Sequence, residues 1–269
     1  MLRNVSKQIL GKLGYELVRT KRRTYGGEWD SYVRAAREKI KNEGVPGDHT
    51  VWPGDEWADA ANWERIFQTL LADKLPRAST RFVELGQGSG KYTEKVVRHF
   101  SGANVLCADV SESFLAVLAE RLHEEIAAGR VSALLIDQRN HRQLLQAIEA
   151  RGWVGKLDAL YSIDAMVHVD LQIQFAYWLT AAQALRPGGL LALTLADPTT
   201  DEGFGKLVAD VALYYSKQGI PSHKFEWLGP DMVTALLTRL GFGEIEITRV
   251  RPRDIYVTAR LQRPYVGAW

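Results

Sequence analysis

From Arg81 onward, short apolar runs alternate with longer stretches that have helical periodicity. The runs predicted as strands are 81–85, 104–109, 131–136, 157–163 and 189–196. The stretches between them, predicted as helices, are 91–100, 112–128, 141–150 and 170–186. Because such an alternation joins parallel strands through right-handed crossovers, it predicts an α/β fold with helices on both faces of a mostly parallel sheet.

The last part of the chain adds two helices and two strands to this prediction. The helices are expected at 202–218 and from Gly229-Pro230 to Gly241. Two segments of alternating pattern, 244–250 and 255–261, flank a basic loop and predict a C-terminal β-hairpin. The expected sheet therefore has seven strands.

Residues 24–80 are predicted as a helical cap or lid that precedes the main domain, 81–269. The glycines in Tyr25-Gly26-Gly27 are expected to break the chain before the first helix. The cap helices are predicted from Glu28 to Glu43 and from Asn62 to Leu75.

Residues 1–23 concentrate the positive charge. They hold seven basic side chains and one acidic one, a net +6 in a chain of +2, which leaves −4 for the other 246 residues. Their apolar positions, at helical spacing, are Leu2, Val5, Ile9, Leu13 and Leu17. A basic amphipathic helix of this kind either lies on an anionic membrane or packs on the body or on a second subunit in a homodimer. The slightly acidic remainder argues against nucleic acid as a partner.

Composition narrows the class of protein further. The single cysteine, Cys107, excludes an intrachain disulfide framework and any multi-cysteine metal site. No apolar run reaches the roughly 18 residues of a spanning helix, and the N-terminus lacks the features of a secretory signal. We therefore expect a cytoplasmic protein, peripheral on the inner face of the cytoplasmic membrane if residues 1–23 bind lipid.

A glycine loop follows the first predicted strand, in Glu84-Leu85-Gly86-Gln87-Gly88-Ser89-Gly90-Lys91. Glycines at this point let the backbone approach a ligand at a helix N-terminus. The spacing does not fit a P-loop, and Lys91 stands where a dinucleotide-binding loop has its third glycine. The carboxyl group of Glu84 directly before the loop suits a cationic ligand instead.

Acidic residues also end the next two predicted strands. Asp109 lies 19 residues after Gly90, where a carboxylate can accept hydrogen bonds from both ribose hydroxyls of a nucleoside. The alternative is that Asp109 caps the helix that follows. Asp137 ends the third strand, where an acid can equally belong to a turn.

These features together resemble class I S-adenosylmethionine (SAM) methyltransferases: the loop resembles their motif I, and Leu185-Arg186-Pro187-Gly188-Gly189 resembles their L-x-P-G-G turn. The resemblance covers roughly residues 80–261. It implies a Rossmann-like fold and SAM as the cofactor, with the adenine amino group near Asp137. The cofactor-binding residues it indicates are Glu84, Gly86, Gln87, Gly88, Gly90, Asp109, Val110, Asp137, Gln138 and Ser162.

A narrower resemblance lies after the fourth strand, in Ser162-Ile163-Asp164-Ala165-Met166-Val167-His168. Sugar methyltransferases of bacterial surface-glycan (O-antigen or capsule) biosynthesis have a similar pattern there, and segment 13–19 also looks like theirs. Gln87 departs from this subgroup, many of whose members have proline. The resemblance implies O-methylation of a sugar hydroxyl in a glycan or its lipid-linked precursor.

Transfer to a hydroxyl benefits from a base beside the methyl group, because a hydroxyl is hardly ionised at neutral pH. We expect His168 as this base, with Asp164 orienting it or contacting the substrate. His223 is an alternative base, and packing or capping is the alternative role of His168. A metal held by acids such as Asp164 and Asp197 is not expected, because no local acid cluster is visible.

The segment from His49 to Trp57 either roofs the pocket, with Trp52 or Trp57 stacking on a ligand, or forms a structural turn.

Three other functions of the protein stay open. They are a SAM methyltransferase of a small soluble metabolite, a SAM-binding interaction protein without activity, and, more distantly, a nicotinamide-dependent oxidoreductase.

Overall fold

The computed structural model describes residues 25–43, 52–137, 139–215 and 224–267. The predictions made for the basic segment 1–23, for Gln138 and for His223 lie outside the described residues.

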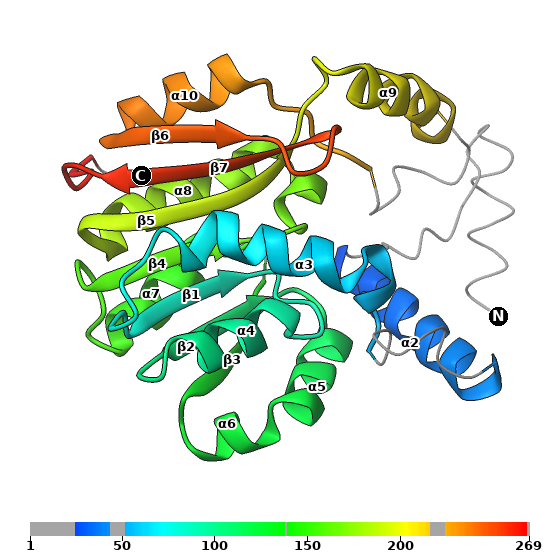
Figure 1. The fold of residues 1–269 in the computed structure, drawn as a ribbon, viewed down its shortest axis with the longest axis horizontal. Coiled ribbons are helices and arrows are strands. Elements are labelled where there is room, and N and C mark those ends of the chain that lie inside the picture. The colour runs from blue at the N-terminus through cyan, green and yellow to red at the C-terminus, as the bar shows by residue number, and fades with distance from the viewer. Residues whose placement is uncertain (1–24, 44–51, 138, 216–223, 268–269) are drawn as a thin grey trace, which may run out of the picture.

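A seven-stranded sheet in the order β3-β2-β1-β4-β5-β7-β6 forms the centre of the molecule (Figure 1). Five strands are parallel, and β7 runs antiparallel between β5 and β6. The strands are β1 Arg81–Leu85, β2 Asn104–Asp109, β3 Val131–Leu135, β4 Leu157–Ser162, β5 Leu185–Ala196, β6 Phe242–Thr248 and β7 Asp254–Leu261. The predicted mostly parallel sheet and its C-terminal antiparallel pair are confirmed.

Helices cover both faces of the sheet, as the alternating pattern predicts (Figure 1). The helices of the main domain are α4 Lys91–His99, α5 Glu112–Arg121, α6 His123–Ala127, α7 Gln143–Ala150, α8 Leu171–Ala184, α9 Asp201–Tyr214 and α10 Pro230–Arg239. The predicted helix 112–128 is divided into α5 and α6, and the 185–189 turn is absorbed into the start of β5. No helix in the described part of the chain is long and apolar enough to cross a membrane.

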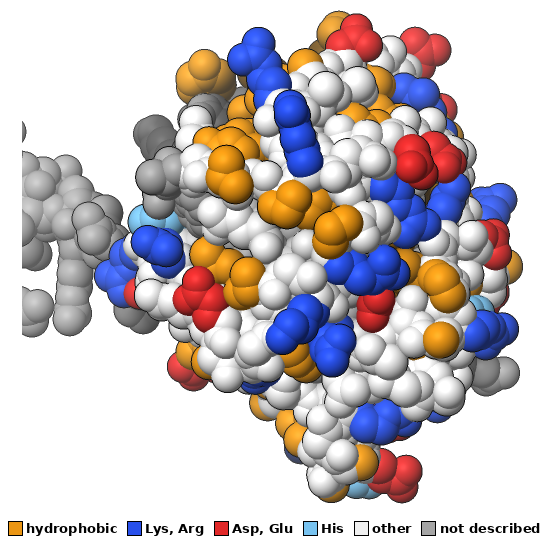
Figure 2. All heavy atoms as spheres, turned by 90° about the vertical axis from the view of Figure 1, so that its left-hand side faces the viewer, with side chains coloured by type: hydrophobic (Ala, Val, Ile, Leu, Met, Phe, Trp, Pro, Cys, Tyr) orange, Lys and Arg blue, Asp and Glu red, His pale blue; other side chains and the backbone are white. Residues whose placement is uncertain are grey.

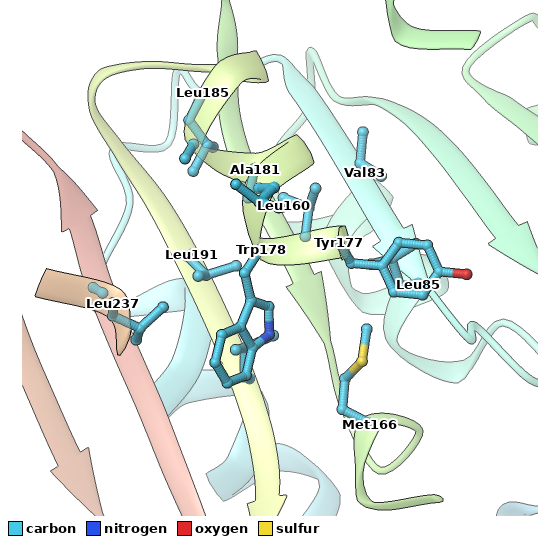
Figure 3. Close-up of a cluster of buried hydrophobic side chains, with 14 of the residues drawn as sticks. Val83, Leu85, Leu160, Met166, Tyr177, Trp178, Ala181, Leu185, Leu191 and Leu237 are labelled. Carbon is cyan, nitrogen blue, oxygen red and sulfur yellow. The ribbon is translucent and has the colours of Figure 1, made fainter. Parts of the chain in front are cut away.

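Two hydrophobic clusters, one on each face, follow from the pleat of the strands, because successive side chains point to opposite faces. Val83 and Leu85 of β1 join the cluster under α7, α8 and α10, where Trp178 is fully buried (Figure 3). Phe82, between them in sequence, joins the opposite cluster under α4. Both faces of the central strands are therefore sealed, and only the strand ends are open to ligands.

The described residues before the sheet form four helical segments. They are α2 Tyr25–Glu43, the 3-10 helix η1 Asp55–Trp57, α3 Ala60–Phe67 and the π-helix η2 Gln68–Ala72, which continues α3. The predicted break at Tyr25-Gly26-Gly27 is wrong, because α2 runs through these residues. A Cβ atom on Gly26 would lie 2.1 Å from the carbonyl oxygen of Val110, so a glycine here permits close contact with the end of β2 instead of breaking the helix.

Candidate active site

A pocket of about 880 Å³, partly open to solvent, lies at the C-terminal ends of β1, β2 and β4. In parallel sheets this edge is where ligands bind, since the loops that follow the strands converge there. The glycine loop and the ends of β2 and β4 line it from the sheet, and the residues from the segments before the sheet that line it are Tyr25, Trp29, Pro53, Gly54, Trp57 and Trp63.

The glycine loop forms one wall of this pocket. Gly86, Gly88 and Gly90 have φ angles of 66°, 53° and 82°, a region that side chains rarely adopt. A Cβ atom on Gly86 would lie 2.3 Å from the Cβ atom of Ala165. The loop therefore keeps its backbone open toward the pocket, and Gly86 and Gly88 line it while Gly90 caps α4.

Asp109 ends β2 inside the pocket. Its carboxylate is 6% exposed and accepts hydrogen bonds from the backbone N–H groups of Ser111 (2.9 Å) and Gly88 (3.3 Å). Burial raises the pKa of Asp109 to about 6. The N-cap of α5 is Ser111, whose hydroxyl accepts from Phe114, so the capping alternative for Asp109 does not apply.

The residues present fit a nucleoside. Asp109 offers acceptors for a ribose diol, while the apolar side chains of Val110 and Ile136 line the pocket beside it. Gln87 also lines the pocket, and its buried Oε1 atom has no hydrogen-bond partner among the described residues. An orphaned acceptor of this kind calls for a donor from a ligand. Asp109, Gln87, Val110 and Ile136 are therefore the residues that would hold SAM.

Two predicted binding residues lie beneath the pocket. Glu84 is 2% exposed, and its Oε2 atom accepts hydrogen bonds from the hydroxyls of Thr93 (2.5 Å) and Tyr161 (2.8 Å). Ser162 donates a hydrogen bond of 2.8 Å to the carbonyl oxygen of Leu85. Neither side chain lines the pocket, so both are placed to support the loop from below.

Asp137 lies outside the pocket. Its half-exposed carboxylate forms an ion pair with Arg139 (2.8 Å), which holds the pKa of Asp137 down to about 2. The preceding residue, Ile136, lines the pocket instead. The predicted contact of Asp137 with the adenine amino group therefore stays a prediction.

Asp164 follows β4 and lines the pocket directly. It has a φ angle of 61°, which is uncommon for a residue with a side chain. Its Oδ1 atom is hydrogen-bonded to Arg251, whereas its buried Oδ2 atom has no partner among the described residues. Burial is the largest influence on its pKa, which is raised in spite of Arg251.

His168 lies one layer further out. Its Nδ1 atom is 2.9 Å from the carbonyl oxygen of Lys224, and its ring contacts Trp29 and Phe225 at centroid distances of 5.4 and 5.0 Å. Because a carbonyl only accepts, Nδ1 carries the proton in the neutral ring and Nε2 is the basic nitrogen. His168 is not among the lining residues. The hydrogen-bond partner of Asp164 Oδ1 is Arg251, and that of His168 Nδ1 is the carbonyl oxygen of Lys224, so Asp164 does not orient the His168 ring through these atoms.

Sequence reasoning missed Lys91, which lines the pocket. Its Nζ atom lies 3.2 Å from Asp55 Oδ1 and 3.2 Å from the ring centroid of Trp63. Burial lowers the pKa of Lys91 to about 8. Its place after the glycine loop is visible in the sequence, but the burial depends on Asp55 and Trp63, which are distant in sequence.

Aromatic side chains from the predicted cap line the pocket opposite the glycine loop. Trp29 of α2 contacts Trp57 at a centroid distance of 6.2 Å, and Trp57 is 43% exposed. Trp52 is not among the lining residues and packs beside Val33 and Phe114. Of the two stacking candidates, the structure therefore brings only Trp57 to the pocket. No group of three or more potential metal ligands occurs in the described ranges.

Comparisons with known proteins agree with this geometry. Residues 83–191 match a family model described as a methyltransferase domain. The chain is also 33% identical over 84 residues to the uncharacterized phycocyanin operon protein W of Pseudanabaena tenuis, which is 31% of this chain and 71% of that protein.

Two solved structures show how widely the fold is shared. An O-methyltransferase family protein from Burkholderia thailandensis aligns with a TM-score of 0.54 at 15% identity, over 92% of this chain and 62% of that one. Magnesium protoporphyrin IX methyltransferase from Synechocystis, with bound S-adenosylhomocysteine, aligns with a TM-score of 0.55 at 17% identity, over 84% of this chain and 98% of that one. The chain thus spans less than two thirds of the Burkholderia protein, and identities this low establish the fold alone.

Proposed function

Because the chain has a methyltransferase domain and the fold of class I SAM-dependent methyltransferases, we propose that it transfers a methyl group to a hydroxyl oxygen of its acceptor. The observation that carries this proposal is the carboxylate of Asp164, whose Oδ2 atom is buried in the pocket without a partner among the described residues. A carboxylate oxygen of this kind is suited to accept a hydrogen bond, and then the proton, from a hydroxyl group.

SAM, when bound, would supply an electrophilic methyl group: the acceptor oxygen forms a C–O bond to it as the C–S bond breaks and S-adenosylhomocysteine leaves. Arg251 fixes the second carboxylate oxygen of Asp164, so that Oδ2 is held in one direction. Trp29, Trp57 and Trp63 line the pocket and offer flat apolar surfaces against which an acceptor can be positioned. Positioning of this kind supplies much of the rate in a displacement reaction.

We further infer that the hydroxyl belongs to a sugar ring, as in a surface glycan or its lipid-linked precursor. A sugar has apolar C–H faces that pack on indole rings and hydroxyls that hydrogen-bond to carboxylates. The pocket combines both kinds of partner, in its indole rings and in Asp164. The pattern of residues 162–168 supports the same acceptor class.

A small soluble metabolite is the second candidate acceptor. The observation in its favour is the apolar side of the pocket, where Phe114, Ile163, Met166 and Tyr177 line the wall. A planar phenol would pack on these side chains as readily as a sugar packs on indole.

Variants at the two candidate bases test the proposed chemistry. Asparagine tolerates positive φ angles, so Asp164→Asn preserves the backbone while it removes the basic oxygen. We expect a loss of roughly 10²–10⁴-fold in turnover with SAM affinity changed only a few fold, measured with methyl-labelled SAM and calorimetry. His168→Gln is compared in parallel. Unchanged turnover in Asp164→Asn would contradict the proposal and favour His168 as the base. SAM binding by the wild type without any turnover would instead indicate a protein that binds SAM without transfer.

The acceptor class is tested separately with labelled SAM. Nucleotide sugars and polyprenyl-linked glycans form one panel, and simple phenols form the other. Label in the sugar panel alone supports the glycan acceptor, whereas label in the phenols alone supports the metabolite.

A further inference from the structure

One helix of the structure exposes a row of large apolar side chains. In α9, Phe204 is 61% exposed, Val208 is 55% exposed and Val211 is 52% exposed. Their spacing of four and three residues puts them on one face of the helix. Single exposed apolar residues are ordinary, but a row along one helix face indicates a surface that another element covers.

We compare this row with the end of the molecule that lies farthest from α9. It is the end from which the parallel strands start, and there basic, acidic and apolar side chains are interspersed (Figure 2). The row on α9 lies at the other end, because α9 begins at Asp201, shortly after the last parallel strand ends at Ala196.

The basic segment 1–23 also has an apolar face that needs a surface to pack on. Five of its apolar residues repeat at spacings of three and four from Leu2 to Leu17, which predicts one apolar helix face. Gly11 and Gly14 weaken an isolated helix by about 1 kcal/mol each, so a helix here needs a surface to pack on.

The point where this segment joins the described chain is linked to α9 through a series of contacts. Tyr25, the first residue of α2, donates a hydrogen bond of 2.8 Å to the carbonyl oxygen of His168. The ring of His168 contacts that of Phe225, and Lys206 of α9 lies 4.9 Å from the Phe225 ring centroid. A chain of three contacts thus connects the start of α2 to α9, and both lie in the right-hand half of Figure 1.

The length of the segment is sufficient to cover the row. Residues 18–24 span up to about 23 Å when extended, and a helix over 2–17 is about 24 Å long. The row from Phe204 to Val211 occupies only about 10 Å of α9. The apolar face of segment 1–23 can therefore reach and cover all three side chains.

Charge favours this occupant over a membrane. Asp201 precedes Phe204 by about one turn and is exposed on nearly the same face, and Glu202 beside it is exposed too. These carboxylates attract a segment of charge +6 and repel the anionic lipids that would otherwise bind such a row.

We propose that residues 1–23 fold back as a helix and pack their apolar face on Phe204, Val208 and Val211 of α9. The packing covers the apolar row and places the basic segment beside the loop that follows β4, at the rim of the pocket. This inference does not depend on which acceptor the enzyme uses.

Disulfide trapping in the full chain tests the contact. The native thiol of Cys107 is fully buried, so introduced cysteines report only on each other. The test pair is Leu13→Cys with Val208→Cys. The matched control is Leu13→Cys with Val154→Cys, because Val154 is 40% exposed but precedes β4 at the opposite end of the sheet.

After mild oxidation, we expect an intrachain disulfide in the test pair at least tenfold more abundant than in the control, seen as a monomer of altered mobility on a non-reducing gel. Adding Phe204→Ser should reduce this yield and speed amide exchange of residues 1–23 at least tenfold. Equal yields in both pairs, crosslinks only between two chains, or segment 1–23 protected only by anionic vesicles would each overturn the proposal. The last two results would indicate a homodimer and a membrane contact respectively.

Discussion

Glu84 should make the folded protein less stable as the pH rises, which is the reverse of the usual behaviour of a carboxylate. The side chain is fully buried under the glycine loop, and burial raises its pKa from an ordinary 4.5 to about 7. Between these two values the folded chain holds a proton that the unfolded chain has released. The contribution of Glu84 to the free energy of unfolding therefore falls as the pH rises from about 4.5 to 7, and this contribution is constant outside the window.

The magnitude follows from the pKa difference. At about 1.4 kcal/mol for each pH unit, Glu84 removes about 3 kcal/mol of unfolding free energy across the window. Glu84→Gln removes this ionisation but keeps a carbonyl oxygen for the hydroxyls of Thr93 and Tyr161. The buried amide group that the substitution adds changes the free energy of unfolding by an amount that is independent of pH. The informative quantity is therefore the slope of the unfolding free energy against pH.

Urea unfolding of wild type and Glu84→Gln between pH 4.5 and 8 measures this slope. We expect the variant to gain about 3 kcal/mol relative to wild type over that range. The control is Glu149→Gln, which removes the same charge at an exposed position. A difference between wild type and Glu84→Gln that stays constant with pH would refute the reasoning.

Three further predictions concern the pocket. Gly86→Ala should weaken SAM binding at least tenfold by calorimetry, because the added Cβ atom would lie 2.3 Å from that of Ala165 at a φ of 66°. SAM affinity should fall as the pH drops through about 6, where Asp109 gains a proton and loses acceptor capacity, and Asp109→Asn should show weak binding without this pH dependence. Asp55→Asn should lower the free energy of unfolding in urea by about 3 kcal/mol, because the buried Lys91 loses its carboxylate partner.

The periodicity of the sequence was sufficient for the sheet and its helices, because each strand and helix has its own apolar pattern. The sequence prediction failed at Gly26, where two consecutive glycines predict a break in the chain. The reason for that glycine is tertiary, since the carbonyl oxygen of Val110 leaves no room for a Cβ atom. No local pattern of residues 25–43 contains this information.

The site residues also divide into those predicted from local sequence patterns and those that depend on tertiary contacts. Asp109 and Gly86 follow directly from strand ends and loop spacing, and both line the pocket. Glu84 lies on the face of β1 that points into the cluster around Phe82, so the strand pleat turns it away from the pocket. Lys91 was overlooked because its environment is built by Asp55 and Trp63, and contacts between distant segments cannot be deduced from spacing.

The contact between Gly26 and Val110 also bears on how acceptor preference can change. Val110 follows Asp109, so α2 rests on the same stretch of backbone that shapes the ribose side of the pocket. Moving α2 inward to fit a smaller acceptor would push this stretch and disturb the side that holds SAM. New acceptors are therefore better accommodated by exchanging the side chains of Tyr25 and Trp29, which line the pocket, than by shifting the helix. For enzyme engineering, the backbone of α2 should be kept in place and its pocket-lining side chains exchanged.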